Sequence, residues 1–284
     1  MNESDNIMGS RLADKDGIRL ENTEMADDQL SDLSKRIVSR TRNLIDEARR
    51  RGITLRVLGG IAVIIHSEGV IPPLLLREIR DADLVVEKGK VKQLTTMFRE
   101  LGYDENRRFN LVNGRERLIY FDPENKTQLD VFVGEFNMCH RLSLDARLAY
   151  DSYTLPLAEV LLTKLQIVQL NDKDLKDILL VLQQHDVQED VDEERINISA
   201  LASHCASDWG FCKTVVDNIS LALEKLPGVG LDERDSTLVE SRITQVARAI
   251  EERPKSVAWK LRALVGTKVR WYELPEEVTG AIEM

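Results

Sequence analysis

VLGGIAVIIH, residues 57–66, is an apolar run that carries two adjacent glycines near its start. A glycine inside a strand or a helix weakens that element by about 0.5–1 kcal/mol relative to alanine. The simplest interpretation is a tight turn at Gly59 and Gly60 between a short buried strand, TLRVLGG, and a helix, IAVIIHSEG. The functional alternative is a backbone that another group must approach closely. The neighbouring motifs show which of these two interpretations of the glycines applies.

The overall composition is that of an acidic globular protein. Its 284 residues suggest one large or two modest domains, and a hydrophobic content of 43% allows a sizeable core. A formal net charge of −10 argues against a protein that coats nucleic acid non-specifically, although a local basic groove remains possible. The polar N-terminus lacks the features of a secretory signal or a transit peptide, and no apolar run reaches the length of about 20 residues that crosses a bilayer. We therefore expect a soluble cytoplasmic protein without a membrane partner.

Hydrophobic periodicity predicts an α+β fold, with a small mixed sheet and flanking helices followed by a helical region. Residues 1–28 are polar and are expected to form a mobile arm. The sheet domain is predicted at residues 29–190 and a helical C-terminal domain at 191–284, with the charge run at 187–195 as a linker or a solvated loop. The expected elements are a helix at 27–52 that Gly52 closes, strands at 54–60 and 82–86, a helix at 90–103 and a hairpin at 117–134.

Two of the predicted strands carry aspartates among apolar residues. In IRDADLVV, residues 79–86, Asp81 and Asp83 point to one face of the strand. In QLDVFVG, residues 128–134, Asp130 lies on the face opposite to the valines. An edge strand with a solvated face would explain the first pair without any function. If the two strands are neighbours, three carboxylates converge, and they cannot all stay ionised without a cation such as Mg²⁺.

Further motifs follow in a recognisable order. Arg77 stands four residues before Asp81, Lys164 lies in a predicted helix, and Lys173–Asp174 opens the next one. Together with the two glycines and the three aspartates, this order resembles the DNA polymerase beta-like nucleotidyltransferase superfamily. The chain is most similar to the bacterial minimal and abortive-infection-toxin-type members. The resemblance covers roughly residues 53–185, with an insert at 67–79 that is longer than in the shortest members and could hold a small element or shape substrate choice.

The resemblance implies an enzyme that uses Mg²⁺ to transfer a nucleoside monophosphate from an NTP such as ATP, with release of pyrophosphate. Its catalytic and metal-binding residues would be Asp81, Asp83 and Asp130, which hold the Mg²⁺ ions, with Asp130 also activating the acceptor. The nucleotide would be bound by backbone N–H groups at the glycines and by phosphate-neutralising side chains: Gly59, Gly60, Arg77 and Lys164. Asp174 would orient Lys164 or the acceptor.

The residues on the predicted helices also allow interpretations without function. Lys164 lies in an apolar stripe, so it either reaches the surface or points into a site with anions. Asp174 suits the first turn of a helix for electrostatic reasons alone, and it borders an apolar stripe from which Asp177 points away. His66 is interpreted as a packed or capping residue. Cys205 and Cys212 are expected in the core and not, with His204, in a metal site.

The acceptor is not determined by these motifs. It could be a tRNA or other RNA end, a protein side chain or a small molecule, and a toxin-like role is possible. The segment 253–274 interleaves basic and aromatic residues, which suits either RNA binding or, as we favour, a helix with a basic face anchored by tryptophans. The alternative from another class is a non-catalytic nucleotide-binding or regulatory module that retains the fold.

Overall fold

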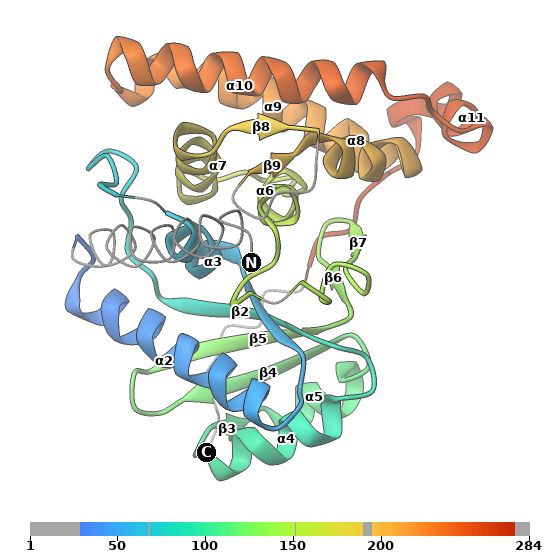
Figure 1. Ribbon diagram of the computed structural model, residues 1–284. Helices are drawn as coiled ribbons and strands as arrows, with labels where there is room; N and C mark the ends of the chain where they lie inside the picture. The colour runs from blue at the N-terminus through green and yellow to red at the C-terminus, as the bar shows by residue number, and fades with distance from the viewer. Residues whose placement is uncertain (1–28, 68, 151, 190–194, 276–284) are drawn as a thin grey trace, which may run out of the picture.

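The computed structural model describes residues 29–67, 69–150, 152–189 and 195–275. The fold is α+β, as the sequence predicts, with a five-stranded mixed sheet that is covered by helices on both faces (Figure 1). The predicted arm at 1–28 lies outside the described residues. None of the helices described has both the length and the apolarity that crossing a membrane requires.

The elements follow one another in a mixed order up to residue 143 and are mainly helical afterwards. They are α2 (Asp32–Arg50), β1 (Leu55–Leu58), α3 (Gly59–His66), β2 (Asp81–Val86), α4 (Val91–Glu100), β3 (Asp104–Glu105), α5 (Arg107–Asn113), β4 (Arg117–Asp122), β5 (Thr127–Val133), β6 (Glu135–Asn137), β7 (Arg141–Ser143), α6 (Leu157–Leu165), α7 (Asp172–Gln184), β8 (Val187–Gln188), β9 (Ile196–Asn197), α8 (Ile198–Ser207), α9 (Trp209–Val229), α10 (Glu233–Glu252), α11 (Val257–Val265) and a 3₁₀ turn (Gly266–Lys268).

The strand order of the main sheet is β1-β2-β5-β4-β3, in which β2 and β5 are parallel and the other neighbours are antiparallel. The predicted hairpin is confirmed as β4 and β5, with Ile119 opposite Asp130. Helices α2, α4 and α5 lie below the sheet in Figure 1, and α3, α6 and α7 lie above it. On the lower face, the rings of Phe98 and Tyr120 pack edge to face with centroids 4.5 Å apart, which ties α4 to β4.

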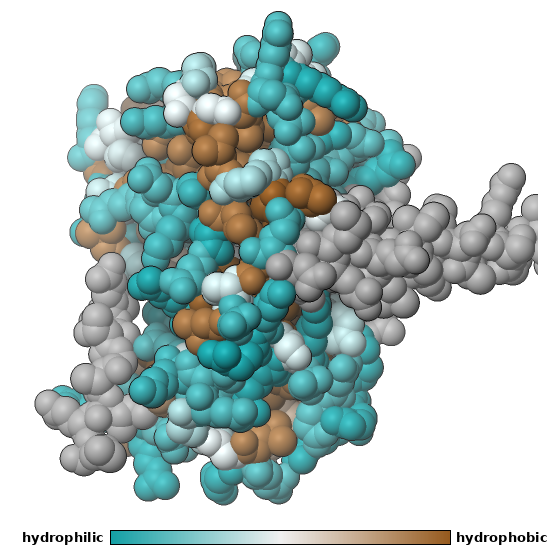
Figure 2. All heavy atoms as spheres, turned by 90° about the vertical axis from the view of Figure 1, so that its left-hand side faces the viewer, coloured by the Kyte–Doolittle hydropathy of each residue, from teal (hydrophilic) through white to brown (hydrophobic). Residues whose placement is uncertain are grey.

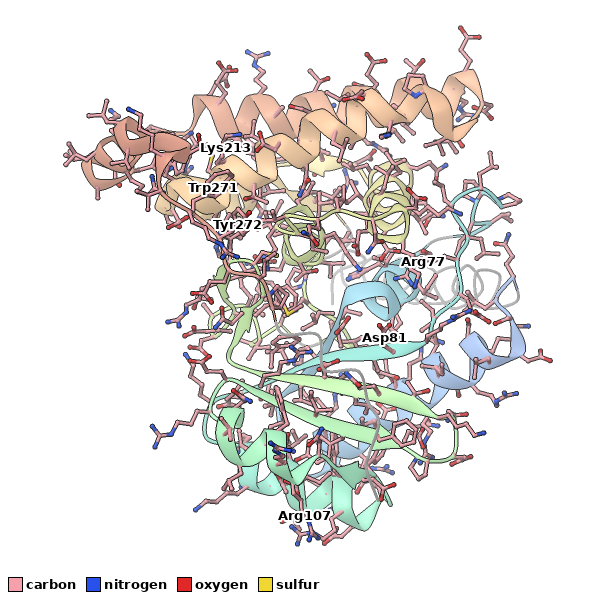
Figure 3. The ribbon with its side chains drawn as sticks, turned by 180° about the vertical axis from the view of Figure 1, so that it is seen from behind. Arg77, Asp81, Arg107, Lys213, Trp271 and Tyr272 are labelled. Carbon is pink, nitrogen blue, oxygen red and sulfur yellow. The ribbon has the colours of Figure 1, made fainter. Side chains whose placement is uncertain are left out.

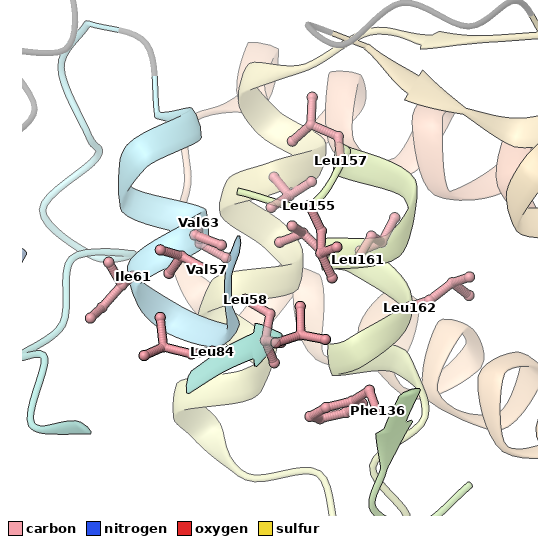
Figure 4. Packing of buried hydrophobic residues seen from close by; sticks show 14 of the residues in the cluster. Val57, Leu58, Ile61, Val63, Leu84, Phe136, Leu155, Leu157, Leu161 and Leu162 are labelled. Carbon is pink, nitrogen blue, oxygen red and sulfur yellow. The ribbon is translucent and has the colours of Figure 1, made fainter. Parts of the chain in front are cut away.

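The turn predicted at the two glycines is confirmed, and so is the close approach. Gly59 has a φ of +65°, which glycine adopts without the steric cost that a side chain brings. A Cβ atom on Gly59 would overlap the Asp83 carboxylate, and one on Gly60 would overlap the Arg77 guanidinium. The rest of α3 is almost entirely buried and packs with α6 around leucines that Figure 4 shows at close range. Glycine is therefore required at both positions, because the side chains of Asp83 and Arg77 occupy the space beside the start of α3.

The C-terminal helices continue the packing of the sheet domain. The buried apolar residues of the described chain form one cluster that runs from α2 to α10. Arg242 of α10 donates hydrogen bonds to the carbonyls of Leu182 and Gln183 at the end of α7. The charge run predicted as a linker or loop has its ends held together, because Val187 pairs with Ile196 in the parallel β8–β9 ladder. The domain boundary predicted after residue 190 stays a prediction.

The outer surface is predominantly hydrophilic on the face that Figure 2 shows, where smaller apolar areas are interrupted by polar side chains. In the predicted insert at 67–79, the described residues form no helix or strand. Ile71, Leu75 and Ile79 are nevertheless buried, whereas Val70 and Leu74 are exposed. The insert is thus an irregular segment with an anchored apolar side.

Replacing Gly59 by alanine is expected to destabilise the protein more than the same change at Gly52. Both residues have a φ of +65°, so both variants carry the cost of about 1–2 kcal/mol for a left-handed alanine. Gly52 has open space around it, whereas a methyl group at Gly59 must displace Asp83, which adds about 1–3 kcal/mol. Urea unfolding of the two variants measures the difference, and equal free energies of unfolding would contradict the contact.

Candidate active site

The three predicted aspartates come together on the upper face of the sheet. The parallel register of β2 and β5 places Asp83 opposite Asp130, and Asp81 follows the same face of β2. They line a cavity of about 610 Å³. All of the residues predicted from the sequence contribute to its wall: Gly59, Gly60, Arg77, Asp81, Asp83, Asp130, Lys164 and Asp174. The sheet, the start of α3, α6 and the start of α7 therefore enclose one site.

Asp83 is the most perturbed carboxyl group of this cavity. It is partly buried, and this burial together with the charges of Asp81 and Asp130 raises the pKa of Asp83 to about 8. Lys164 and Arg117 act in the opposite direction but do not cancel the effect. A carboxyl group in this position gains from any cation that replaces its proton.

Asp130 is already bound by two protein side chains. Nε and Nη2 of Arg117 donate to its Oδ1 at 2.9 and 2.6 Å, and Nε2 of Gln128 donates to its Oδ2 at 2.9 Å. Arg117 lies on β4 and shares the face of Asp130, because Ile119 is opposite Asp130 in the hairpin. Arg117 is not among the site residues predicted from the sequence. The register of the predicted hairpin was the signal that could have identified it.

A second set of charges forms the helical wall of the cavity. Nε and Nη2 of Arg77 donate to the two carboxylate oxygens of Asp177, each at 2.7 Å. Nζ of Lys164 lies 2.8 Å from Oδ2 of Asp177 and 3.0 Å from Oδ1 of Asp174. Burial by itself raises the pKa of Asp177, but Lys164 and Arg77 outweigh it and hold that pKa below its ordinary value. Burial lowers the pKa of Lys164, yet Asp177 and Asp174 raise it above the ordinary value.

The structure corrects the position expected for Asp177. The sequence pattern pointed it away from the apolar stripe of its helix, but only 3% of this residue is exposed. Arg77 arrives from the segment before β2 and Lys164 from α6, so cations from two other elements bury this side of α7. The spacing of Asp174 and Asp177, which places both on one side of a helix, was the available signal.

The charges of the cavity can be balanced pair by pair. Arg77 and Lys164 are matched by Asp174 and Asp177, and Arg117 is matched by Asp130. Asp81 and Asp83 form no salt bridge within the described part of the chain. On the rim, Arg80 pairs with Glu78 at 2.6 Å, and Lys173 is exposed. Two carboxylates therefore remain for an added cation.

The donor set fits Mg²⁺ in a specific way. Among the described residues, no three acidic, histidine or cysteine side chains are arranged to hold a metal ion by themselves. Mg²⁺ usually binds through one or two carboxylates and completes its coordination with water and substrate phosphates. Asp81 is exposed and Asp83 is partly buried, and neither carboxylate forms a salt bridge within the described part of the chain, so this pair suits that mode.

His66, Cys205, Cys212 and Trp259 have structural roles. Nε2 of the buried His66 lies 2.9 Å from the carbonyl oxygen of Leu155 and 2.6 Å from Oγ1 of Thr154, as expected for a packed histidine. Cys205 and Cys212 are buried in the core, as predicted. Trp259 anchors α11, because its Nε1 donates to the carbonyl of Cys205 at 3.0 Å.

Comparisons with known proteins add little to this geometry. No protein-family model matches the sequence, and no curated protein does. An antigenic nucleotidyltransferase-like protein from Paracoccidioides brasiliensis aligns with 81% of this chain and 97% of its own, at 15% identity and a TM-score of 0.39. A STING-associated CdnE c-di-GMP synthase from Capnocytophaga granulosa aligns over 87% and 92%, at 9% identity and a TM-score of 0.23. At such values, neither protein assigns a role to a residue of this chain.

Replacing Asp83 by asparagine is expected to stabilise the metal-free protein at alkaline pH. A raised carboxyl pKa means that the folded state loses stability as the pH rises from about 4 to about 8, because ionisation costs more in the folded than in the unfolded state. The asparagine has no such cost, so the variant should melt about 2 °C or more above the parent at pH 9 in EDTA. The difference should vanish near pH 4. Melting curves across this range, with the exposed Asp104→Asn as the control, measure it; a difference independent of pH contradicts the assignment.

Replacing Asp177 by alanine is expected to be severely destabilising. The change leaves Arg77 and Lys164 in the wall without their shared carboxylate, at a cost of about 3–5 kcal/mol. The matched control is Asp217→Ala, which removes an exposed pair with Lys213 and should cost less than about 1 kcal/mol. Urea unfolding compares the two. Similar losses would show that the buried pairs contribute no more than surface pairs.

Proposed function

We propose that this protein is an Mg²⁺-dependent nucleotidyltransferase that moves a nucleoside monophosphate from an NTP, such as ATP, to an acceptor and releases pyrophosphate. The observation that supports it best is the pair Asp81 and Asp83, two uncompensated carboxylates at the wall of a cavity that cationic side chains also line. The same residues carry the sequence resemblance, so the motif and the geometry agree. The proposal includes a toxin-like role in the cytoplasm.

The chain's own residues would divide the work as follows. Asp81 and Asp83 would hold the Mg²⁺, which when bound neutralises the triphosphate and stabilises the leaving pyrophosphate. The backbone at Gly59 and Gly60 begins a helix, whose N-terminus favours phosphate oxygens. Arg77 and Lys164 would present cationic groups to the phosphates. Asp174 and Asp177 hold these two side chains in position.

Asp130 and Arg117 would change partners during the reaction. In the structure they bind each other, and both line the cavity. A triphosphate that attracts the Arg117 guanidinium would release the Asp130 carboxylate, whose oxygen could then accept the proton of the acceptor hydroxyl. The hydroxyl oxygen would attack the α-phosphorus, and the bond between the α-phosphorus and the bridging oxygen would break as pyrophosphate leaves.

The non-catalytic alternative has one observation in its favour. Both carboxylate oxygens of Asp130 already accept hydrogen bonds from within the protein, Oδ1 from Arg117 and Oδ2 from Gln128. A module that binds a nucleotide without transferring it could keep this arrangement permanently.

The activity test uses each α-labelled NTP with Mg²⁺ and a pool of RNA and lysate acceptors. We expect label transfer by the parent chain and a loss of about 100-fold or more in Asp81→Asn and Asp83→Asn, because each removes a ligand that stabilises charge in the transition state. Asp104→Asn on the exposed edge strand β3 is the control and should keep its activity. Full transfer by both cavity variants would refute the assignment. NTP binding without transfer by the parent chain would favour the non-catalytic module.

A further inference from the structure

A second cavity of about 600 Å³ adjoins the candidate active site. Cys139 lines both cavities, and the chain passes from Tyr272 in the second to Leu274 and Pro275 in the first. The backbone N–H of Glu273 donates to the carbonyl of Cys139 at 3.0 Å, which fixes this crossing segment to the strand pair β6–β7. The two cavities are therefore neighbours that meet at Cys139 and the segment 272–275.

Aromatic rings and arginines share the wall of this second cavity. The rings of Trp271 and Tyr272 are 5.2 Å apart, edge to face, and the Arg270 guanidinium lies 4.8 Å from the centre of the Tyr272 ring. Arg141 lines the same cavity from β7; it is exposed, and its Nε lies 3.3 Å from Oε2 of Glu135 on β6. Cationic side chains beside aromatic rings are the combination with which proteins hold phosphates and unpaired bases.

The charge of this region is opposite to that of the whole protein. Residues 253–272 contain six lysines and arginines and no acidic residue, although the chain carries a net charge of −10. The two acidic residues of the cavity wall are Asp208, whose carboxylate accepts the N–H of Phe211 as the N-cap of α9, and Glu273 at its edge. A local positive field of this kind favours an anionic ligand.

The structure separates the anchoring groups of this segment from the available ones. Arg262 stacks over Trp209 at 4.5 Å and donates to the carbonyls of Gly266 and Val269, so it supports the segment from inside. Nε1 of Trp271 donates to Oγ1 of Thr214 and holds this ring in place. Arg270 is exposed and Tyr272 only partly buried, which leaves both accessible from the cavity.

We propose that the second cavity binds the end of a single-stranded nucleic acid, which is the acceptor of the nucleotide. Arg141 and Arg270 would contact backbone phosphates, and a terminal base would stack on the Tyr272 ring with Trp271 beside it. Figure 3 shows these two rings on one side of the molecule and Arg77 with Asp81 on the other, so the strand would run past Cys139 toward the aspartates. This inference rests on the proposed nucleotidyl transfer, for which it names the acceptor class.

The experiment measures binding of a labelled 20-nucleotide single strand, as RNA and as DNA, to the full chain without NTP. Arg270→Glu and the double variant Arg270→Ala/Tyr272→Ala are expected to weaken binding about tenfold or more, because they remove one phosphate contact and one stacking platform. The matched control is Lys260→Ala/Lys268→Ala, which removes two exposed cations of the same segment outside the cavity wall and should lose less than about threefold. Binding of either the RNA or the DNA strand supports the proposal. The ratio of the two affinities shows which of them is the acceptor.

Arg270→Glu changes an exposed side chain, so it keeps the test valid if the double variant does not fold. Wild-type affinity in Arg270→Glu, an equal loss in the lysine control, or equal binding of a blunt duplex would overturn the proposal. Asp81→Asn separates the two hypotheses, since it should bind the strand normally while it loses transfer. If the parent chain transfers no label but the Arg270 variants lose the strand, the proposed transfer fails and the nucleic-acid site stands.

Discussion

The position of Asp83 in the sheet is the constraint on which both the fold and the site depend. In the register of the sheet, Leu58 of β1 lies opposite Asp83, and Asp83 lies opposite Asp130 of β5. The residue after Leu58 must therefore turn away beside a carboxylate, and a side chain at that position would overlap it. Gly59 resolves this conflict and starts α3 at the same point. One row of residues across the sheet thus sets the turn, the helix and the acidic floor of the cavity.

The charges of the cavity explain why the site suits a divalent cation. The helical wall is neutral as a unit, because Asp174 and Asp177 compensate Lys164 and Arg77. On the sheet, the remaining carboxylates are those of β2, and burial with mutual repulsion makes ionisation of Asp83 costly. A proton relieves this cost at Asp83. A dication in its place would neutralise more charge and would add a site for phosphate oxygens.

The sequence predicted those parts of the structure that depend on local patterns. The turn at the glycines, the hairpin of β4 and β5 and the face of each aspartate follow from periodicity and turn chemistry over a few residues. The partners of those residues depend on contacts between distant elements. Asp177 is separated from Arg77 by 100 positions, so a helical pattern read alone placed it outside the core. The sequence likewise did not show that β2 pairs with β5, because the order of the strands depends on the whole sheet.

The insert at 67–79 before β2 has a structural purpose, because it places Arg77 at the cavity. Ile71, Leu75 and Ile79 recur every four residues and are buried, so the segment has an apolar side although it forms no helix. Its backbone is fixed to the first helical layer, since Gln29 exchanges two hydrogen bonds with Ile71 and Oγ of Ser34 accepts from the N–H of Ile79. Because the backbone is fixed at Ile71 and at Ile79, the Arg77 guanidinium lies against the backbone of residue 60, where only glycine leaves room for it. Gly60 is therefore required by the arginine that the insert brings to α3, just as Gly59 is required by the position of Asp83.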